Sequence, residues 1–434
     1  MAAPQPQKML SVFDSVCIIV GIIIGAGIYE TAPLIASCMG TGLATLAIWL
    51  LGGLIALAGA LNYSELATTY PRQGGDYVYL TRAFGRPMGF LFGWTQLVII
   101  RPGDIALMAF IFGRYGSTLY SFAYSKIVYA ISAIVVLSLI NMLSVRQTKW
   151  TQNALTVIKI VGLGGLITAG LWAPYDGPAE LPVTEAGAIP LALILVLYTF
   201  GGWNEMAYVA AEVKQPQRNI SRALVLGTLV VTVLYLLVNG AFLNALGYSG
   251  VATSEAVATE TIAGVFSQNA GRFISILICI STLGAVNGLI FTGARISYAL
   301  GTEHQFFGLL GRWHSRFGTP IWALILQGGL ALGIIGFAGS FLDTILYTAP
   351  VVWVFFLGTC LSVWILRRKD RHAERGYKVP LYPVPTLVFG AACVFMLYSS
   401  VVYALRQKPA GFCIAAGCFL LGGIVYAITQ QKTD

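Results

Sequence analysis

The stretch Gly21–Tyr29, GIIIGAGIY, lies in the middle of the first long apolar run of the chain, residues 12–37. Its three glycines weaken a helix that lipid would otherwise require, so the sequence predicts a break in that helix. A comparable stretch, LYTFGGWN at Leu197–Asn204, lies in the apolar run 188–211. Gly25 and Gly201 lie equally far from the starts of their runs. This match favours an internal repeat with one broken helix in each half.

The composition is that of a membrane protein. Of the 434 residues, 57% are hydrophobic and only 10% are charged, which no ordinary soluble domain shows. Apolar runs long enough to cross a bilayer recur twelve times, and without strict alternation they predict helices rather than a β-barrel. The predicted spans are 12–37, 41–67, 88–113, 127–144, 150–172, 188–211, 222–246, 272–300, 320–338, 342–366, 381–405 and 410–429.

The repeat predicts how these spans are organised. Residues 12–172 would form a first repeat of helices 1–5, residues 188–366 an inverted second repeat of helices 6–10, and residues 381–429 helices 11 and 12. In such a repeat the two broken helices place half-helix ends near the bilayer midplane, where a small zwitterion can bind. The alternative is that the glycines only permit close helix packing.

The positive charges indicate the orientation. The net charge is +9, but its distribution along the predicted spans points to a membrane and not to nucleic acid. By the positive-inside rule both termini are expected in the cytoplasm, as an even number of spans requires. Nineteen of the 26 Lys and Arg fall on that side: Lys8, Arg72, Arg82, Arg86, Arg146, Lys149, Lys214, Arg218, Arg222, Arg295, Arg312, Arg316, Arg367, Arg368, Lys369, Arg371, Arg375, Lys378 and Lys432.

Other classes of protein are less favoured. The seven cysteines lie in or beside apolar spans and suggest neither a disulfide framework nor a metal site, and no cofactor is expected. The three histidines, His304, His314 and His372, fall in predicted loops, which argues against a membrane enzyme. A channel would need a symmetric pore, whereas two broken helices favour an occluded site.

Further motifs accompany the two breaks: YPRQGGDYVYL at Tyr70–Leu80, IIRP at Ile99–Pro102, NMLSV at Asn141–Val145, LGAVNGLIFTGAR at Leu283–Arg295 and YKVPLYP at Tyr377–Pro383. In this order the chain resembles, almost from end to end, the amino acid, polyamine and organocation superfamily, and within it the L-type amino acid transporters. The resemblance implies the LeuT-type fold with broken helices 1 and 6, and transport by alternating access. The loop at residues 70–87 is itself predicted to form a helix at the membrane interface, because it carries aromatic residues.

The resemblance also implies a substrate site. The backbone amides of Ala26 and Gly27 would bind the substrate carboxylate, as the start of a half-helix favours an anion. The carbonyls of Ile23, Tyr198, Thr199 and Gly201 would receive the ammonium. Tyr198 stands where the family places an aromatic gate, and Asn204 and Tyr235 match polar positions that line or brace the pocket. For Tyr235, simple packing is an open alternative.

Ionisable residues within the spans are functional candidates by default. Lys159 matches a lysine that sodium-independent members place beside the first helix break, where its ammonium would substitute for a coupling cation. Asp104 faces the pocket by the same resemblance, at a position where the family usually has a small hydroxyl residue. Arg101, three residues away, can pair with Asp104 and make it purely structural. Glu30 and Glu205 also depart from the family pattern.

The sequence therefore predicts a sodium-independent exchanger of neutral L-amino acids in the plasma (inner) membrane. Transport coupled to protons and a preference for cationic amino acids or polyamines remain open alternatives. Animal light subunits of this type carry a cysteine after the third span for a disulfide to a heavy chain. Residues Ser117–Ser125 contain none, so no disulfide-linked partner is expected.

Overall fold

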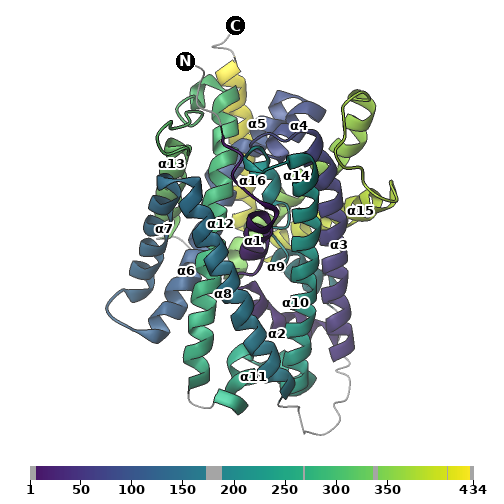
Figure 1. Cartoon of the computed structure of the whole chain (residues 1–434). Coiled ribbons are helices and arrows are strands. Elements are labelled where there is room, and N and C mark those ends of the chain that lie inside the picture. Colours follow the sequence, from purple (N-terminus) through teal and green to yellow (C-terminus); the bar gives the residue numbers. More distant parts are fainter. Residues whose placement is uncertain (1–5, 173–187, 267–268, 336–340, 408, 431–434) are drawn as a thin grey trace.

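The computed structural model describes residues 6–172, 188–266, 269–335, 341–407 and 409–430. Within these ranges the chain is helical, with only isolated bridges such as Leu10 to Val213. The long helices run side by side as one bundle, with both termini at one end and α11 at the other (Figure 1). The helices are α1 Val12–Ile23, α2 Gly27–Met39, α3 Gly42–Thr69, α4 Asp76–Phe84, α5 Arg86–Thr95, η1 Gln96–Ile100, α6 Arg101–Leu119, α7 Ser125–Leu143, α8 Val145–Trp172, α9 Ile189–Thr199, η2 Glu205–Glu212, α10 Pro216–Thr253, α11 Val257–Phe266, α12 Ala270–Glu303, η4 Gln305–Phe307, α13 Ile321–Ile335, α14 Phe341–Lys369, α15 Val384–Gln407 and α16 Pro409–Gln430.

The helices make this an integral membrane protein. Among the described residues, eight helices are long and apolar enough to cross a membrane, and the bent pair α1 and α2 makes a ninth. Three shorter apolar helices, Ile189–Thr199, Ile321–Ile335 and Ala415–Thr429, coincide with three further predicted spans. The all-helical membrane fold is thus confirmed, whereas the count of twelve spans stays a prediction. Residues 336–338 of one predicted span lie outside the described ranges.

Both predicted helix breaks are present. α1 ends at Ile23 and α2 begins at Gly27, and the two are bent by 51°. α9 ends at Thr199, and a turn leads into the 3₁₀ helix η2. Gly202 in that turn has φ +111, and a side chain there would meet Ile22 of α1 at 2.7 Å. Glycine is therefore needed both for the backbone conformation and for the close approach of the two breaks.

The segment after α3 forms the helix α4, and the start of α4 packs into the protein, whereas Phe84 at its end is exposed; its position at a membrane interface stays a prediction. Tyr77 and Tyr79 of α4 are buried inside the bundle. Asp76, at the start of α4, is fully buried and accepts hydrogen bonds from three hydroxyls: Tyr63 of α3, Tyr208 of η2 at 2.6 Å and Thr359 of α14 at 2.5 Å. These donors replace the water that the carboxylate loses on burial. α4 is thereby tied to three other elements.

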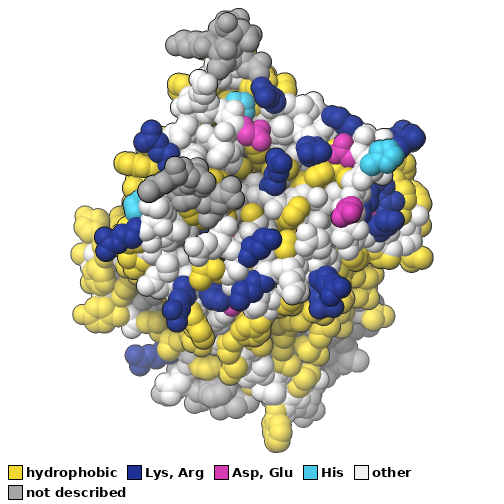
Figure 2. All heavy atoms as spheres, turned by 45° about the horizontal axis from the view of Figure 1, so that its top comes forward, with side chains coloured by type: hydrophobic (Ala, Val, Ile, Leu, Met, Phe, Trp, Pro, Cys, Tyr) yellow, Lys and Arg dark blue, Asp and Glu magenta, His cyan; other side chains and the backbone are white. Residues whose placement is uncertain are grey.

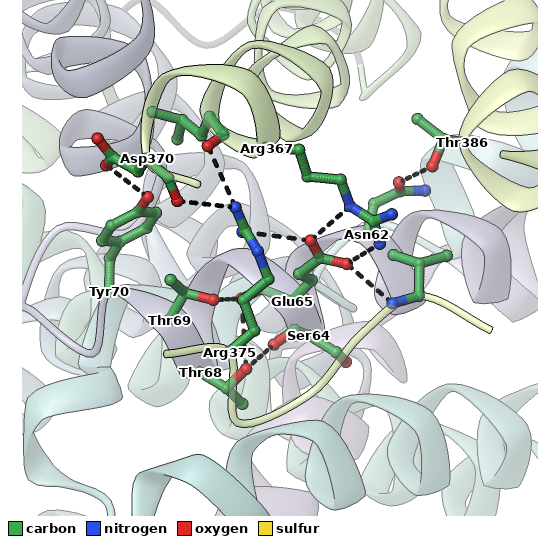
Figure 3. A network of polar contacts seen from close by, with 12 residues as sticks. Asn62, Ser64, Glu65, Thr68, Thr69, Tyr70, Arg367, Asp370, Arg375 and Thr386 are labelled. Atoms are coloured by element: carbon green, nitrogen blue, oxygen red, sulfur yellow. Dashed lines mark hydrogen bonds and ion pairs between the residues drawn. The ribbon is translucent and has the colours of Figure 1, made fainter. Parts of the chain in front are cut away.

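A second polar network fixes the ends of α3 and α14 (Figure 3). The buried carboxylate of Glu65 accepts from Arg367 Nε at 2.8 Å, from Arg375 Nη1 at 3.3 Å and from the backbone N–H of Val379 at 2.8 Å. Beyond the end of α14, Asp370 accepts from the Tyr70 hydroxyl at 2.7 Å and pairs with Arg82 at 2.8 Å. These two partners lower the pKa of Asp370 below its ordinary value.

The charged surface lies at the end of the molecule that carries the termini. Figure 2 shows Lys and Arg spread over this face, with a hydrophobic surface below it. The last turn of α14 contributes three basic residues, Arg367, Arg368 and Lys369. The arrangement is that of a membrane protein with one strongly basic aqueous face.

Candidate binding site at the two helix breaks

A cavity of about 160 Å³ lies where the two broken helices meet. This is many times the roughly 10–15 Å³ that a single water needs. Its walls come from α1 and α2, η1 and α6, the α9–η2 turn, α12 and α14. Seven residues predicted for the substrate site line it: Ile23, Gly27, Asp104, Tyr198, Thr199, Gly201 and Asn204. Ala26 and Tyr235 are not among the lining residues.

The start of α2 faces this cavity without a side-chain cap. Ala26 occupies the N-cap position, and its side chain accepts no hydrogen bond from the first N–H groups of α2. The carbonyl oxygen of Ala26 accepts hydrogen bonds from the backbone N–H groups of Tyr29 and Glu30 at 3.0 and 3.1 Å. The first N–H groups of a helix have no partner inside it, so they are available to an anion. A side chain at Gly27 would come within 3.1 Å of Thr199 Cγ2, which shows how closely α2 and α9 pack.

Tyr235 braces the two breaks from outside the cavity. Its side chain is fully buried, and its hydroxyl lies 2.9 Å from the carbonyl oxygen of Ile23 and 3.1 Å from that of Thr199. The hydroxyl can donate to either carbonyl, so it joins the end of α1 to the end of α9. These contacts go beyond simple packing, whereas a part for Tyr235 in substrate binding stays a prediction.

Lys159 of α8 lies against the first break. Its side chain is fully buried, and its ammonium donates to the carbonyls of Gly21 at 2.8 Å, Ile24 at 2.5 Å and Ser281 at 3.0 Å. All three donors of the ammonium are therefore used. The charge holds the unwound end of α1 against α8 and α12. A side chain at Gly284 would come within 3.0 Å of Nζ, so this glycine makes space for the lysine.

Arg101 pairs with Glu205 and not with Asp104. Nη2 and Nη1 lie 2.7 and 3.0 Å from the two carboxylate oxygens of Glu205, and Nε donates to Gln96 at 2.9 Å. Both charged side chains are about 95% buried, and the guanidinium stacks over the Tyr208 ring at 5.0 Å. A bidentate pair with a further hydrogen bond satisfies the guanidinium. The possibility that Arg101 neutralises Asp104 through a direct ion pair is therefore wrong.

Several lining residues escaped the sequence analysis. Gln96 belongs to a π-helical turn that directly precedes Arg101, a feature common at functional sites. Trp353, Phe355 and Phe356 of α14 form an aromatic wall, and Met108 approaches Gly25 of the first break. The π-helical turn leaves no clear pattern in the sequence. The aromatic residues of α14 could have been noticed only as part of an otherwise uniform apolar run.

Ion pairs tie the broken helices to their neighbours. Toward the termini, Asp14 of α1 pairs with Lys149 of α8 at 3.2 Å, and Glu212 of η2 pairs with Arg295 of α12 at 2.8 Å with both side chains fully buried. Toward the other end, Glu30 of α2 pairs with Arg114 of α6 and accepts from the Tyr115 hydroxyl at 2.8 Å. Glu30 therefore lies outside the cavity and takes part in a contact between helices.

A small, partly polar cavity between two broken helices in a membrane protein is typical of transporters of small solutes. The family is defined by comparison of the sequence: residues 10–423 match the amino acid permease family, and the chain belongs to it. The chain is 31% identical to the b(0,+)-type amino acid transporter 1 of Mus musculus, covering 97% of this chain and 87% of the relative. It is 30% identical to a serine/threonine exchanger of Bacillus subtilis, covering 91% and 92%. It is also 30% identical to the human cystine/glutamate transporter, covering 94% and 83%.

Proposed function

We propose that this permease is a sodium-independent exchanger of neutral L-amino acids that works by alternating access. The observation that carries the proposal is the junction of the two broken helices. There, uncapped helix groups face the cavity, and Lys159 donates to the carbonyls of the first break. The relatives named as amino acid transporters, and one named as an exchanger, support the same function.

The substrate's backbone groups would bind at the junction. The amides of Ala26 and Gly27 bind the carboxylate, since the N-terminus of α2 favours negative charge. The carbonyls of Ile23, Tyr198, Thr199 and Gly201 bind the ammonium. Tyr235 keeps two of these carbonyls in place. The Tyr198 ring covers the substrate. Asn204 supports the cavity wall by donating a hydrogen bond to the Tyr208 hydroxyl at 2.8 Å.

The chain is proposed to lie in the plasma (inner) membrane with both termini in the cytoplasm. The basic face in Figure 2 supports this orientation, because cytoplasmic loops carry the excess of Lys and Arg. The absence of a cysteine in Ser117–Ser125 supports function without a disulfide-linked heavy chain.

Sodium independence follows from Lys159. A fixed ammonium surrounded by three carbonyls occupies the place where a coupling cation would bind, and it repels a second cation. We expect the initial rate of uptake of labelled L-serine or L-threonine into proteoliposomes to be unchanged when choline replaces sodium. A large loss of uptake in choline, with protein-free liposomes as the background, would contradict this role of Lys159.

A further inference from the structure

Asp104 is an acidic side chain in the cavity wall that the proposed function leaves unexplained. It lies in the first turn of α6, directly after the π-helical turn, and its side chain is partly exposed to the cavity. The residue therefore faces whatever occupies the cavity. It is not needed to bind the backbone groups of an amino acid, which are already accounted for at the helix breaks.

The charges around Asp104 are already paired with one another. Every nitrogen of the Arg101 guanidinium donates to Glu205 or Gln96. Within the described part of the chain, no hydrogen bond or ion pair to Asp104 is present. A carboxyl group can accept a hydrogen bond whether or not it is ionised, so Asp104 offers the cavity an acceptor that no described protein group uses. The Arg101–Glu205 pair is neutral overall, so Asp104 has no counter-charge of its own in the ion pairs of this wall.

The position of Asp104 suits the side chain of a bound amino acid. Met108 lies one turn further along α6, and its sulfur is 3.3 Å from where a side chain on Gly25 would begin. α6 thus passes the first break near Met108, and Asp104 is displaced from that point by about 6 Å along the helix. A short side chain on a substrate held at the break, together with the hydrogen bond that it donates, spans a distance of this order. Much of the remaining wall is apolar, including Ile22, Leu289 and Trp353.

These observations define the chemistry that Asp104 would recognise. An apolar side chain placed against the carboxyl group of Asp104 would displace the water bound to it without supplying a hydrogen-bond donor, which costs free energy. A side chain with a hydroxyl or amide group would supply that donor. A site built to hydrogen-bond one group discriminates against the isostere that lacks it far better than an apolar pocket can.

We propose that Asp104 determines substrate specificity by accepting a hydrogen bond from the substrate's side chain. The preferred substrates are then neutral L-amino acids whose side chain carries a donor, with serine and threonine as the simplest members. This inference rests on the proposed function, because it assumes that the amino acid's backbone groups bind at the two helix breaks.

The test compares amino acids of equal shape that differ only in the donor. Affinities of threonine and valine, and of serine and 2-aminobutyrate, are measured for the purified protein from ligand-induced shifts in melting temperature. We expect the hydroxyl member of each pair to bind at least about tenfold more tightly in the wild type. In Asp104→Ala the difference within each pair should vanish, and in Asp104→Asn, which keeps an acceptor, it should be intermediate.

Stability separates this role from a structural one. Asp104→Ala should melt close to the wild type, because it removes no described ion pair. Glu205→Gln is the matched control and should melt lower, because it deprives the buried Arg101 of its counter-charge. An Asp104→Ala variant that melts as low as Glu205→Gln, or that keeps the wild-type preference for the hydroxyl amino acids, would overturn the inference.

The same experiment distinguishes the inference from the proposed function. If amino acids bind the wild type without preference within the pairs, the inference fails and the proposed function stands. If no amino acid of a panel of twenty binds, the proposed function fails as well. Lysine tests whether the site prefers a positively charged side chain. If lysine binds more tightly than norleucine and serine in the wild type, and this advantage is lost in Asp104→Ala, the role of Asp104 is supported. The neutral substrate class is then overturned.

Discussion

Gly27→Val is expected to abolish amino acid binding in a protein that still folds. A single carbon added at this position would lie 3.1 Å from Thr199 Cγ2 and 3.3 Å from Thr199 Oγ1. Valine adds two further methyl groups and resists unwound geometry because of its branched side chain. The extra atoms push α2 away from α9 and crowd the amides proposed to bind the carboxylate. Amino acid binding to the purified variant, measured by ligand-induced thermal stabilisation, should be undetectable.

Two further variants make this result interpretable. Gly164→Val in α8 is the matched control, since a side chain there meets nothing within 4 Å, and it should bind normally. Gly27→Ala adds only the first carbon and should bind more weakly than the wild type while melting near it. Wild-type affinity in folded Gly27→Val would show that the substrate binds elsewhere.

Lys159→Ala is expected to eliminate transport and lower the melting temperature. The substitution leaves the carbonyls of Gly21 and Ile24 at the break without their donor, and each buried unsatisfied group costs about 1–3 kcal/mol. It also opens space beside the broken end of α1, which then loses its fixed position. Uptake into proteoliposomes and the melting temperature of the purified protein are the two measurements.

Lys159→Gln provides the comparison. Its amide can replace part of the donor set but carries no charge, so the variant should melt between the wild type and Lys159→Ala. Wild-type uptake and stability in Lys159→Ala would contradict the view that this ammonium holds the first break in place.

The sequence predicted those features whose cause is local. Glycines at positions 21, 25 and 27, and again at 201 and 202, weaken a helix wherever the chain runs, so both breaks were found in the expected places. The apolar runs likewise gave the all-helical membrane fold. The family resemblance supplied Lys159, and the structure places its ammonium against the first break.

The features that depend on distant parts of the chain were not predicted. Arg101 pairs with Glu205, 104 residues away, whereas the sequence alone offered Asp104 at helical spacing. The sequence indicated a helix after α3 but not its packing: Asp76 accepts from the hydroxyls of Tyr63, Tyr208 and Thr359. Burial of a polar group is decided by such partners, and a local pattern does not contain them.

Exchange is the central claim, and counterflow tests it most directly. Proteoliposomes are loaded with unlabelled L-threonine or left empty, and the entry of labelled L-threonine is followed in the absence of sodium and of a pH gradient. An obligatory exchanger needs a substrate inside to return its binding site to the outer face, so the account predicts rapid uptake into loaded liposomes and little uptake into empty ones. Equal uptake into both would contradict the account. So would rapid uptake into empty liposomes when a pH gradient is imposed in a parallel assay.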